Sequence, residues 1–466
     1  MVALSLAARV HLLSARPLWH DEAFTEWAAR LPASDLGEAL RRDSGPPLFY
    51  AVERPFARAV TGRENERLLR VVPFLAALAL FLAAPTLPPG RSRRWWIALC
   101  AGFALVNLYA AEARAYGLLA LAGLAIFLLG VVEPPSPARL ASLFATAAAA
   151  LWLHYLALFA VGAALLLALG RRRWTAAGAL AAALALFLPW VPVVRGQPAE
   201  AMAWMRETLA RDAAGFVSAL GGVGRVPAPF GLSPPGAMLA GALLGAALAV
   251  LLAAAARSDE GVRDALLFVA IALGLALAVS LWRPVAFAGR AEMAVLPVWM
   301  WAIARAAGRR RSVAVGAGLA SAAGLATTLA VAFGPHPRST PFSATTSVAR
   351  LAHPGDTMLA GPGFYLPALV ESARGRLAAR VLALPGSDQT HPGWFVPAGA
   401  GPAEERELAR TMDALPEGRR LFLLVPPSYQ TPAVMRILFA RGTVRELARQ
   451  ADAVLLVWSA SATPSS

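Results

Sequence analysis

The sequence predicts an all-α polytopic membrane protein that carries a small external α/β domain at its C-terminal end. Hydrophobic residues make up 58% of the 466 residues and charged residues only 15%, and the mean hydropathy is +0.56. Runs rich in Ala, Leu and Val, long enough to cross roughly 30 Å of hydrocarbon, recur along the chain. Most of these runs lack the polar face that the helices of a soluble bundle need.

The first apolar segment ends before Pro17 and is short for a spanning helix. It contains Arg9 and His11, and no convincing cleavage site precedes Trp19, so we do not expect a cleaved signal peptide. We expect instead a first membrane helix that is clipped or whose start is misassigned. A polar stretch at 17–67 follows it.

Further apolar runs bring the prediction to about eleven crossings, each a helix of membrane-spanning length. A second polar stretch at about 193–235 interrupts them, and a mostly soluble tail occupies 334–466. The predicted domains are therefore a transmembrane module at 1–333 and a soluble α/β domain at 334–466. The runs lie at roughly 68–88, 95–111, 116–132, 140–153, 156–170, 174–192, 236–256, 264–282, 291–307 and 312–333.

Arginine supplies the formal charge of +15, because the sequence contains no lysine. The arginines cluster in short loops between apolar runs, which is typical of topology signals and not of a nucleic-acid groove. When the runs are counted as crossings, all of these loops fall on one side. Calling that side cytoplasmic puts 17–67, 193–235, 283–290 and the tail outside. The dense clusters are Arg91–Arg94, Arg171–Arg173 and Arg309–Arg311, and the weaker ones lie at 133–139 and 257–263.

Composition also indicates the cellular compartment and excludes some kinds of covalent link and metal site. The absence of lysine, with heavy use of Ala, Gly, Pro and Arg, is typical of a GC-rich bacterial genome, so we expect a bacterial inner membrane with the tail in the periplasm. The single cysteine, Cys100, excludes an intramolecular disulfide and a multi-cysteine metal site.

The tail shows the pattern of a small α/β unit. Thr357–Ala360, Leu421–Val425 and Ala453–Trp458 are apolar runs of strand length, bounded by Gly, Pro or Asp. Residues from about 432 to 450 show helical periodicity. The Gly361–Gly363 segment lacks the further glycines and the lysine of a phosphate-binding loop, so we expect a plain turn.

Two adjacent carboxylates, Asp21 and Glu22, appear where the first helix emerges into water. The apolar residues that follow recur at helical spacing, so 22–31 fits an amphipathic helix lying along the membrane interface. Asp21 also fits the N-cap of that helix, with Glu22 as a favourable first-turn charge. Capping and catalysis are both open for this pair.

Three further constellations fall on the same predicted face of the membrane. Asp43 precedes a double proline, and Glu112 and Arg114 lie at the external end of the 95–111 run. An ionisable pair at a membrane boundary is costly unless it is paired or functional. His154 and Tyr155 end the next outward run.

In linear order these segments are WHDEAFTEWA, DSGPPLFYAVERPFARAVTGRENERLLR, NLYAAEARAYGLLAL, LWLHYLALFAV and FLPWVPVV. Over roughly 17–310 the chain resembles the bacterial branch of the polyprenyl-phosphate-dependent glycosyltransferases of the GT-C fold. That group includes protein O-mannosyltransferases and the aminoarabinose transferase that modifies lipid A. The Asp-Glu motif and the Glu-Ala-Arg-x-Tyr motif are its more specific parts, and the tail matches no family pattern.

The resemblance implies transfer of a sugar from a polyprenyl phosphate to a hydroxyl or amine of a protein, lipid or glycan at the external face. A carboxylate takes the acceptor proton during attack, and Asp21 matches the first acid of the family motif. Glu22 and Asp43 would position the acceptor or hold a divalent cation such as Mg²⁺ or Mn²⁺. The implied metal ligands are Asp21, Glu112 and His154, and no organic cofactor is expected.

The resemblance also implies a set of cations for the departing phosphate. Arg114 matches the arginine of the family motif and Tyr116 its tyrosine. Arg283 and Arg290 lie at a later external connection, but Arg290 lacks the aromatic residue that follows the family's arginine. Snorkelling of the two later arginines at the interface is an equal alternative. His154 and Tyr155 would contact the phosphate, a metal or the acceptor.

Two other functions stay open: a transporter or flippase of a lipid-linked or polar substrate, and an inactive scaffold for envelope assembly. Transporters place ionisable residues near the bilayer midplane on broken helices, often within inverted repeats. Here the acids gather at one face and no repeat is evident, which favours the enzyme. The enzyme hypothesis requires Asp21, Glu112, Arg114 and His154 to converge on one cavity open to the outer leaflet.

Overall fold

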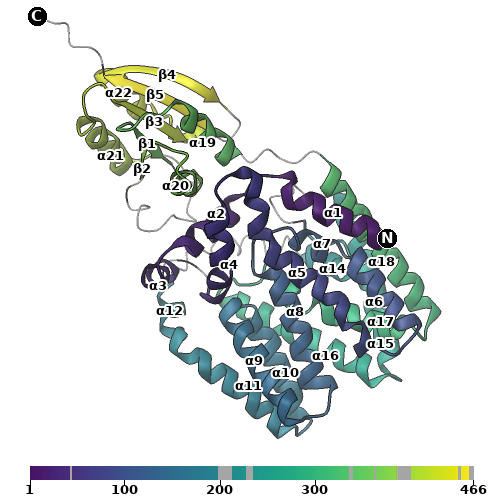
Figure 1. Cartoon of the computed structure of the whole chain (residues 1–466). Helices are drawn as coiled ribbons and strands as arrows, with labels where there is room; N and C mark the ends of the chain where they lie inside the picture. Colours follow the sequence, from purple (N-terminus) through teal and green to yellow (C-terminus); the bar gives the residue numbers. More distant parts are fainter. Residues whose placement is uncertain are drawn as a thin grey trace, which may run out of the picture. The chain divides into compact units, whose positions relative to one another are not determined.

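The computed structural model is mostly helical and contains one five-stranded sheet (Figure 1). The chain divides into two compact units, which are described separately. The first comprises Met1–Ala15, Ser44–Glu53 and Leu69–Pro337, and the second Arg16–Asp43, Arg54–Leu68 and Arg338–Ser466. The structure describes residues 1–41, 43, 45–197, 213–226, 235–334, 340–361, 364–384, 386, 400–449 and 453–460.

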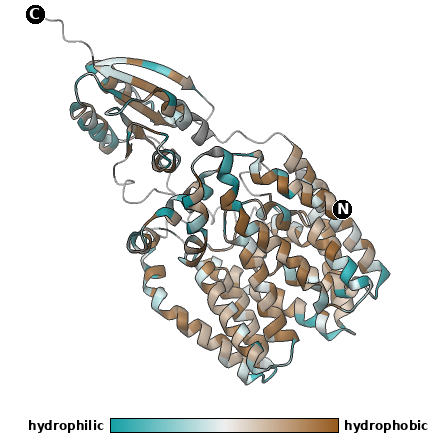
Figure 2. Cartoon of the chain, viewed as in Figure 1, coloured by the Kyte–Doolittle hydropathy of each residue, from teal (hydrophilic) through white to brown (hydrophobic). Residues whose placement is uncertain are grey.

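The helices of the first unit are largely apolar, and hydrophilic residues gather near their ends (Figure 2). Among the described residues, five helical segments are long and apolar enough to cross a membrane. The protein is therefore a multi-pass membrane protein, whereas the number of about eleven crossings stays a prediction. The five segments are Glu64–Thr86, Trp174–Gly196, Gly236–Ala256, Glu260–Trp282 and Arg311–Phe333.

Every predicted apolar run of the first unit coincides with a helix or a consecutive set of helical turns. α4 and α14 lie instead in the predicted polar stretches, and α4 crosses from the first unit into the second. The bounds of the helical elements are α1 (Val2–Ala15), α4 (Leu48–Ala59), α5 (Val71–Ala79), η2 (Leu80–Thr86), α6 (Arg91–Gly102), α7 (Ala104–Tyr109), α8 (Tyr116–Phe127), η3 (Leu128–Val132), α9 (Pro137–Leu153), α10 (Ala157–Gly170), α11 (Trp174–Phe187), η4 (Leu188–Trp190), α12 (Val191–Gly196), α14 (Ala213–Leu220), α15 (Pro235–Ala256), α16 (Glu260–Trp282), η7 (Ala291–Ala294), α17 (Leu296–Ala307) and α18 (Arg311–Phe333).

A fully buried polar network attaches the short helix α1 to the other helices. Arg9 donates hydrogen bonds to Asn107 Oδ1 (2.8 Å) and to the carbonyl oxygen of Cys100 (2.6 Å). Asn107 in turn donates to Thr328 Oγ1 of α18 (3.0 Å). Because these groups are buried, each needs its partner, and α1 is therefore an integral part of the helical unit.

The arginine-rich loops meet at one end of the first unit. Arg173 donates to the carbonyl oxygen of Val131 (2.6 Å), and Arg171 pairs with Asp264. Asp259 binds Arg305 (2.7 Å) and Arg309 (2.8 Å). The sequence-based count placed these loops on one side of the membrane, and their mutual contacts fit that count. Which side is cytoplasmic stays a prediction.

The second unit joins an N-terminal loop to the tail and contains the sheet, whose order is β2-β1-β3-β5-β4. β1 is parallel to both β2 and β3, whereas β5 is antiparallel to β3 and β4. The elements are α2 (His20–Arg30), α3 (Ala33–Arg41), η1 (Arg63–Arg70), α19 (Thr340–Leu351), β1 (Thr357–Ala360), α20 (Tyr365–Ala373), β2 (Arg380–Ala383), α21 (Pro402–Asp413), β3 (Arg420–Val425), η9 (Pro427–Tyr429), α22 (Pro432–Arg441), β4 (Gly442–Arg449) and β5 (Val454–Ala460).

Alternate residues of the central strands pack against helices on both faces of the sheet. Met358 and Phe422 contribute to one core with α19 and α20, and Leu359 and Leu423 to another with α21 and α22. This is the period of two that a strand buried on both faces shows. The three predicted strands are confirmed within one or two residues.

The prediction of a helix over 432–450 is wrong in its second half, because α22 ends at Arg441 and β4 follows directly. β4 has an irregularity in its pairing with β5 between Glu446 and Ala448. The extra residue there interrupts the alternation of a strand. The partly buried residues Val444, Leu447 and Ala448 consequently fall at helical spacing. Pro362 and Gly363 of the predicted turn lie outside the described residues.

Candidate functional site

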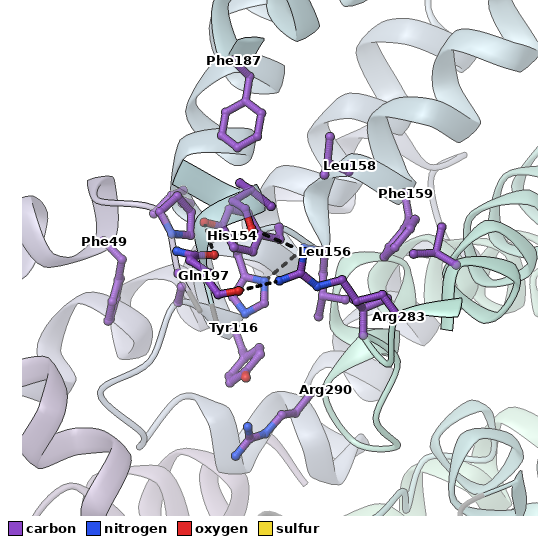
Figure 3. A pocket seen from close by; sticks show the side chains of 18 of the residues that line it. Phe49, Tyr116, His154, Leu156, Leu158, Phe159, Phe187, Gln197, Arg283 and Arg290 are labelled. Atoms are coloured by element: carbon purple, nitrogen blue, oxygen red, sulfur yellow. Dashed lines mark hydrogen bonds between the residues drawn. The ribbon is translucent and has the colours of Figure 1, made fainter. Parts of the chain in front are cut away.

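A cavity of about 560 Å³ lies within the first unit (Figure 3). Aliphatic and aromatic side chains from α4, α8, α10, α11 and α16 form most of its wall. Three guanidinium groups also line it, those of Arg114, Arg283 and Arg290. No carboxylate side chain is among the described lining residues, so the cavity combines an apolar wall with net positive charge.

The Glu-Ala-Arg-x-Tyr motif forms the tight connection between α7 and α8. The backbone N–H of Arg114 donates to the carbonyl oxygen of Glu112 (2.7 Å), and α8 begins at Tyr116. Arg114 and Tyr116 line the cavity. Glu112 is fully buried and is not among the lining residues, so the motif presents its cation and its aromatic ring to the cavity.

His154 lies in the connection between α9 and α10, where its Nδ1 accepts a hydrogen bond from the backbone N–H of Leu156 (3.1 Å). Its ring packs on Tyr116, with the centroids 5.1 Å apart. Burial, together with the positive charges of Arg114 and Arg290, lowers the pKa of His154 to about 3. The imidazole is therefore neutral at physiological pH, and because Nδ1 accepts, Nε2 carries the proton.

Arg290 lies over two aromatic rings. Its guanidinium carbon is 5.7 Å from the ring centroid of Tyr116 and 5.5 Å from that of Phe287. The sequence lacks an aromatic residue after Arg290, where the family pattern has one. Here Phe287 supplies a ring from three positions earlier, and Tyr116 supplies another from α8. Sequence reasoning missed Phe287, although its spacing from Arg290 was visible.

A chain of hydrogen bonds surrounds Arg283. Its Nη1 and Nη2 atoms donate to the carbonyl oxygens of Val194 (3.3 Å) and Gln197 (3.4 Å). The side-chain oxygen of Gln197 accepts from the hydroxyl of Tyr155 (3.1 Å), which accepts from the indole N–H of Trp190 (3.0 Å). Trp190 was missed because the FLPWVPVV segment was treated only as an apolar stretch, and Gln197 lies three residues beyond that segment, in the predicted polar stretch.

The Asp-Glu motif belongs to the second unit. The predicted helix is present as α2, but its N-cap is Trp19, so the prediction of Asp21 as the N-cap is wrong. Glu22 satisfies the start of the helix instead: its carboxylate accepts from the backbone N–H of Trp19 (3.4 Å) and pairs with Arg16 (2.6 Å). Asp21 and Asp43 are both buried, with 7% and 2% of their surface exposed.

The structure thus gathers six of the predicted site residues around one cavity, while their roles stay predictions. Glu112 lies in the turn just before Arg114. Asp21, Glu22 and Asp43 belong to the other unit. The six are Arg114, Tyr116, His154, Tyr155, Arg283 and Arg290.

The metal set of Asp21, Glu112 and His154 stays a prediction, because Asp21 belongs to the second unit and the other two residues to the first. Among the residues that the structure describes, no group of three or more His, Cys, Asp or Glu side chains is arranged to hold an ion.

No protein-family model matches the sequence, and no curated protein matches it. The structure is similar to the crystal structure of ArnT from Cupriavidus metallidurans in the apo state, with a TM-score of 0.60 and 13% identity over 98% of this chain and 96% of that one. The chain has the ArnT fold. The crystal structure of the same ArnT bound to undecaprenyl phosphate matches with a TM-score of 0.59 and 14% identity, over 98% and 97% of the two chains. At the level of the fold, the ArnT likeness confirms the resemblance that the motifs indicated.

Proposed function

We propose that this protein is a membrane glycosyltransferase that transfers a sugar from a polyprenyl-phosphate donor to an acceptor at the external face of a bacterial inner membrane. The observation that carries the proposal is the apolar cavity lined by Arg114, Arg283 and Arg290. Such a cavity suits a ligand that has an anionic head and a hydrocarbon chain. The ArnT fold supports this choice, because ArnT has been crystallised with undecaprenyl phosphate.

The arginines fit the chemistry of a departing phosphate. A planar guanidinium can donate two hydrogen bonds to one phosphate, and an apolar surrounding strengthens that attraction. The phosphate gains negative charge as the sugar leaves, so fixed cations stabilise the transition state more than the ground state. Phe159, Phe187 and Leu184 line the same cavity and offer apolar surface to the polyprenyl chain.

In the proposed reaction, an acceptor hydroxyl or amine attacks the anomeric carbon of the sugar. The bond from that carbon to the phosphate oxygen breaks, and the electron pair leaves with the polyprenyl phosphate. A carboxylate takes the acceptor proton. We assign this base to Asp21 from the motif, with Asp43 as acceptor support, whereas Glu22 is occupied by Arg16 and the start of α2.

Binding of undecaprenyl phosphate to the full-length protein in lipid nanodiscs tests the cavity. We expect Arg114→Ala to weaken binding about tenfold, a loss of about 1.4 kcal/mol. The matched control is Arg263→Ala, which removes an exposed arginine that pairs with Glu260. Arg263 lies in the first turn of α16, whereas the cavity is lined by the last turns of that helix, so we expect this variant to bind the lipid normally. A wild-type protein that does not bind this lipid contradicts the proposal.

Transfer from a panel of polyprenyl-phosphate sugars, including mannose, glucose and aminoarabinose, tests the reaction. We expect Asp21→Asn to abolish transfer while lipid binding stays intact, because the amide keeps the shape of the carboxylate but cannot take a proton. Full activity in that variant would remove Asp21 from the mechanism. Lipid movement across the bilayer without transfer would favour a flippase.

A further inference from the structure

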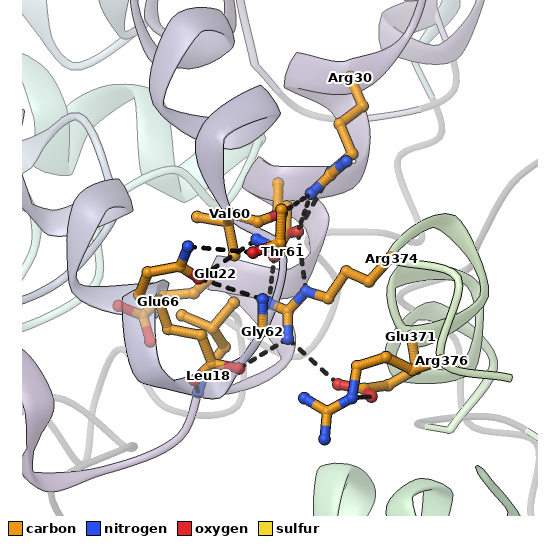
Figure 4. Close-up of polar contacts among 12 residues, drawn as sticks. Leu18, Glu22, Arg30, Val60, Thr61, Gly62, Glu66, Glu371, Arg374 and Arg376 are labelled. Carbon is orange, nitrogen blue, oxygen red and sulfur yellow. Dashed lines mark hydrogen bonds and ion pairs between the residues drawn. The ribbon is translucent and has the colours of Figure 1, made fainter.

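A buried ion cluster in the second unit is centred on Arg374, the residue that follows α20 (Figure 4). Its Nε and Nη2 atoms bind the two carboxylate oxygens of Glu26 (3.1 and 2.6 Å). Its Nη1 binds Glu66 (2.9 Å) and Glu371 (3.1 Å). One guanidinium from the tail therefore joins α2 and η1 of the N-terminal loop.

The centre of the cluster is buried. The side chains of Arg374, Glu26 and Glu371 are fully buried, and that of Glu66 is 4% exposed. Two further arginines contact the glutamates, because Arg30 pairs with Glu26 (2.9 Å) and Arg376 with Glu371 (3.4 Å). Burial acts to lower the pKa of Arg374, but Glu26 and Glu66 raise it above its ordinary value, so the guanidinium stays charged.

Arg374 and its partner Glu66 form hydrogen bonds on both sides of the Asp-Glu motif. On the C-terminal side, the guanidinium binds Glu26 within α2. On the N-terminal side, the second carboxylate oxygen of Glu66 accepts from the backbone N–H of Leu18 (3.2 Å), just before α2. Asp21 lies between these two attachment points. Any rotation or shift of the first turn of α2 must therefore break a buried bond of Arg374 or of Glu66.

We propose that Arg374 is a positioning residue: through Glu26 and Glu66 it fixes the first turns of α2, so that the C-terminal domain sets the orientation of Asp21. The inference rests on the proposed function only in giving Asp21 a catalytic role. The attachment of α2 itself can be measured without any substrate. A gain in stability does not by itself explain the cluster, because a buried ion cluster is often no more stable than an apolar replacement.

Hydrogen exchange of the α2 amides in the full-length protein in nanodiscs tests the attachment. We expect Arg374→Gln, Glu26→Gln and Glu66→Gln each to speed exchange over residues 20–30 at least tenfold. Glu371→Gln is the matched control, because Glu371 binds the same guanidinium but lies on α20 in the tail. We expect exchange in α2 of this control to stay within twofold of wild type. Glu26→Gln and Glu66→Gln also keep the test valid if Arg374→Gln fails to fold.

Undecaprenyl phosphate binding and transfer kinetics separate this inference from the proposed function. We expect Glu26→Gln and Glu66→Gln to keep their affinity for undecaprenyl phosphate and their donor KM within twofold of wild type. We expect their kcat to fall at least tenfold. Unchanged exchange in α2, or equal exchange in Glu26→Gln and Glu371→Gln, overturns the positioning role. A loss of lipid affinity equal to that of Arg114→Ala also overturns it. A wild-type protein that binds no lipid contradicts the proposed function but leaves the exchange result to decide the attachment.

Discussion

At the scale of single residues, this protein relies on the geometry of the guanidinium group. Arg374 uses four N–H bonds to reach three carboxylates, and Arg290 lies over two aromatic rings. A lysine ammonium has neither the planar fork nor the flat face that these contacts need. Replacing either arginine by lysine is therefore not a conservative change.

The neutral state of His154 gives a prediction about pH. Because the folded protein holds its pKa at about 3, below the ordinary value of about 6.5, the folded protein does not protonate it between pH 5 and 8. The unfolded chain does take up a proton below pH 6.5, so this group lowers stability as the pH falls from there towards 3. Nitrogen chemical shifts of labelled histidine should show no titration of His154 between pH 5 and 8.

Arg114→Ala supplies the control for the cause of that shift. Removing one of the two nearby charges should raise the pKa of His154, although burial keeps it below the ordinary value. A His154 that titrates near pH 6.5 in the wild-type protein would contradict its partly buried position near the charges of Arg114 and Arg290.

The sequence reveals the identity of such residues better than their local geometry. The Glu-Ala-Arg-x-Tyr motif identified Arg114 as a candidate site residue, and Arg114 lines the cavity. The N-cap of α2 was misassigned because an acid near a helix start fits several positions, and only the structure shows that Glu22 bonds to Trp19. Phe287 lies only three residues before Arg290, but the second ring, that of Tyr116, comes from α8, and no local pattern in the sequence reveals that contact.

At the scale of helices and strands, glycines set the distance between backbones in the first unit. A Cβ added to Gly123 of α8 would overlap the carbonyl oxygen of Ala294 in η7. η7 directly follows Arg290, which lines the cavity. Close helix approach through small residues is typical of membrane proteins, and here it fixes the segment next to a side chain that lines the cavity.

Gly123→Ala should therefore destabilise the protein by about 1–3 kcal/mol, because the methyl group has no space and η7 must move. Thermal unfolding in detergent measures the loss, and undecaprenyl phosphate binding should weaken with it. Gly274→Ala of α16 is the matched control, since a Cβ there meets nothing within 4 Å. Equal stability of the two variants would contradict the close packing of α8 on η7.

Apolar runs predicted the helices well, because a helix surrounded by lipid and apolar neighbours needs no periodicity to be found. The strand β4 was missed because its irregular pairing places its partly buried side chains at helical spacing. Pairing with β5 decides the structure there, which is a tertiary effect that local sequence does not contain.

At the scale of the whole molecule, the N-terminal loop and the tail form one compact unit. The sequence-based division into 1–333 and 334–466 follows hydropathy, which changes sharply at the end of α18. Hydropathy does not reveal that positions 26, 66 and 374 meet, because the bonds of Arg374 span more than 300 residues. The domain division itself stays a prediction.

The arginine loops give a prediction for membrane topology. Alkaline phosphatase should be active when fused at the C-terminus, and green fluorescent protein at that position should be dark. Fusions made after Arg172 or Ser258, in the arginine loops, should show the opposite pattern, because positive loops stay in the cytoplasm. Active phosphatase at an arginine loop would reverse the predicted orientation, and with it the external position of the tail.

The burial of the Arg374 cluster also has a consequence for ionic strength. Mobile ions screen charges that are in contact with water, with a Debye length of about 8 Å at physiological salt, but they screen desolvated pairs far less. The attachment of α2 should therefore persist in concentrated salt that releases the exposed pairs of the tail, such as Arg441 with Asp413. The position of α2 within the second unit would therefore not depend on the salt concentration of the surrounding medium.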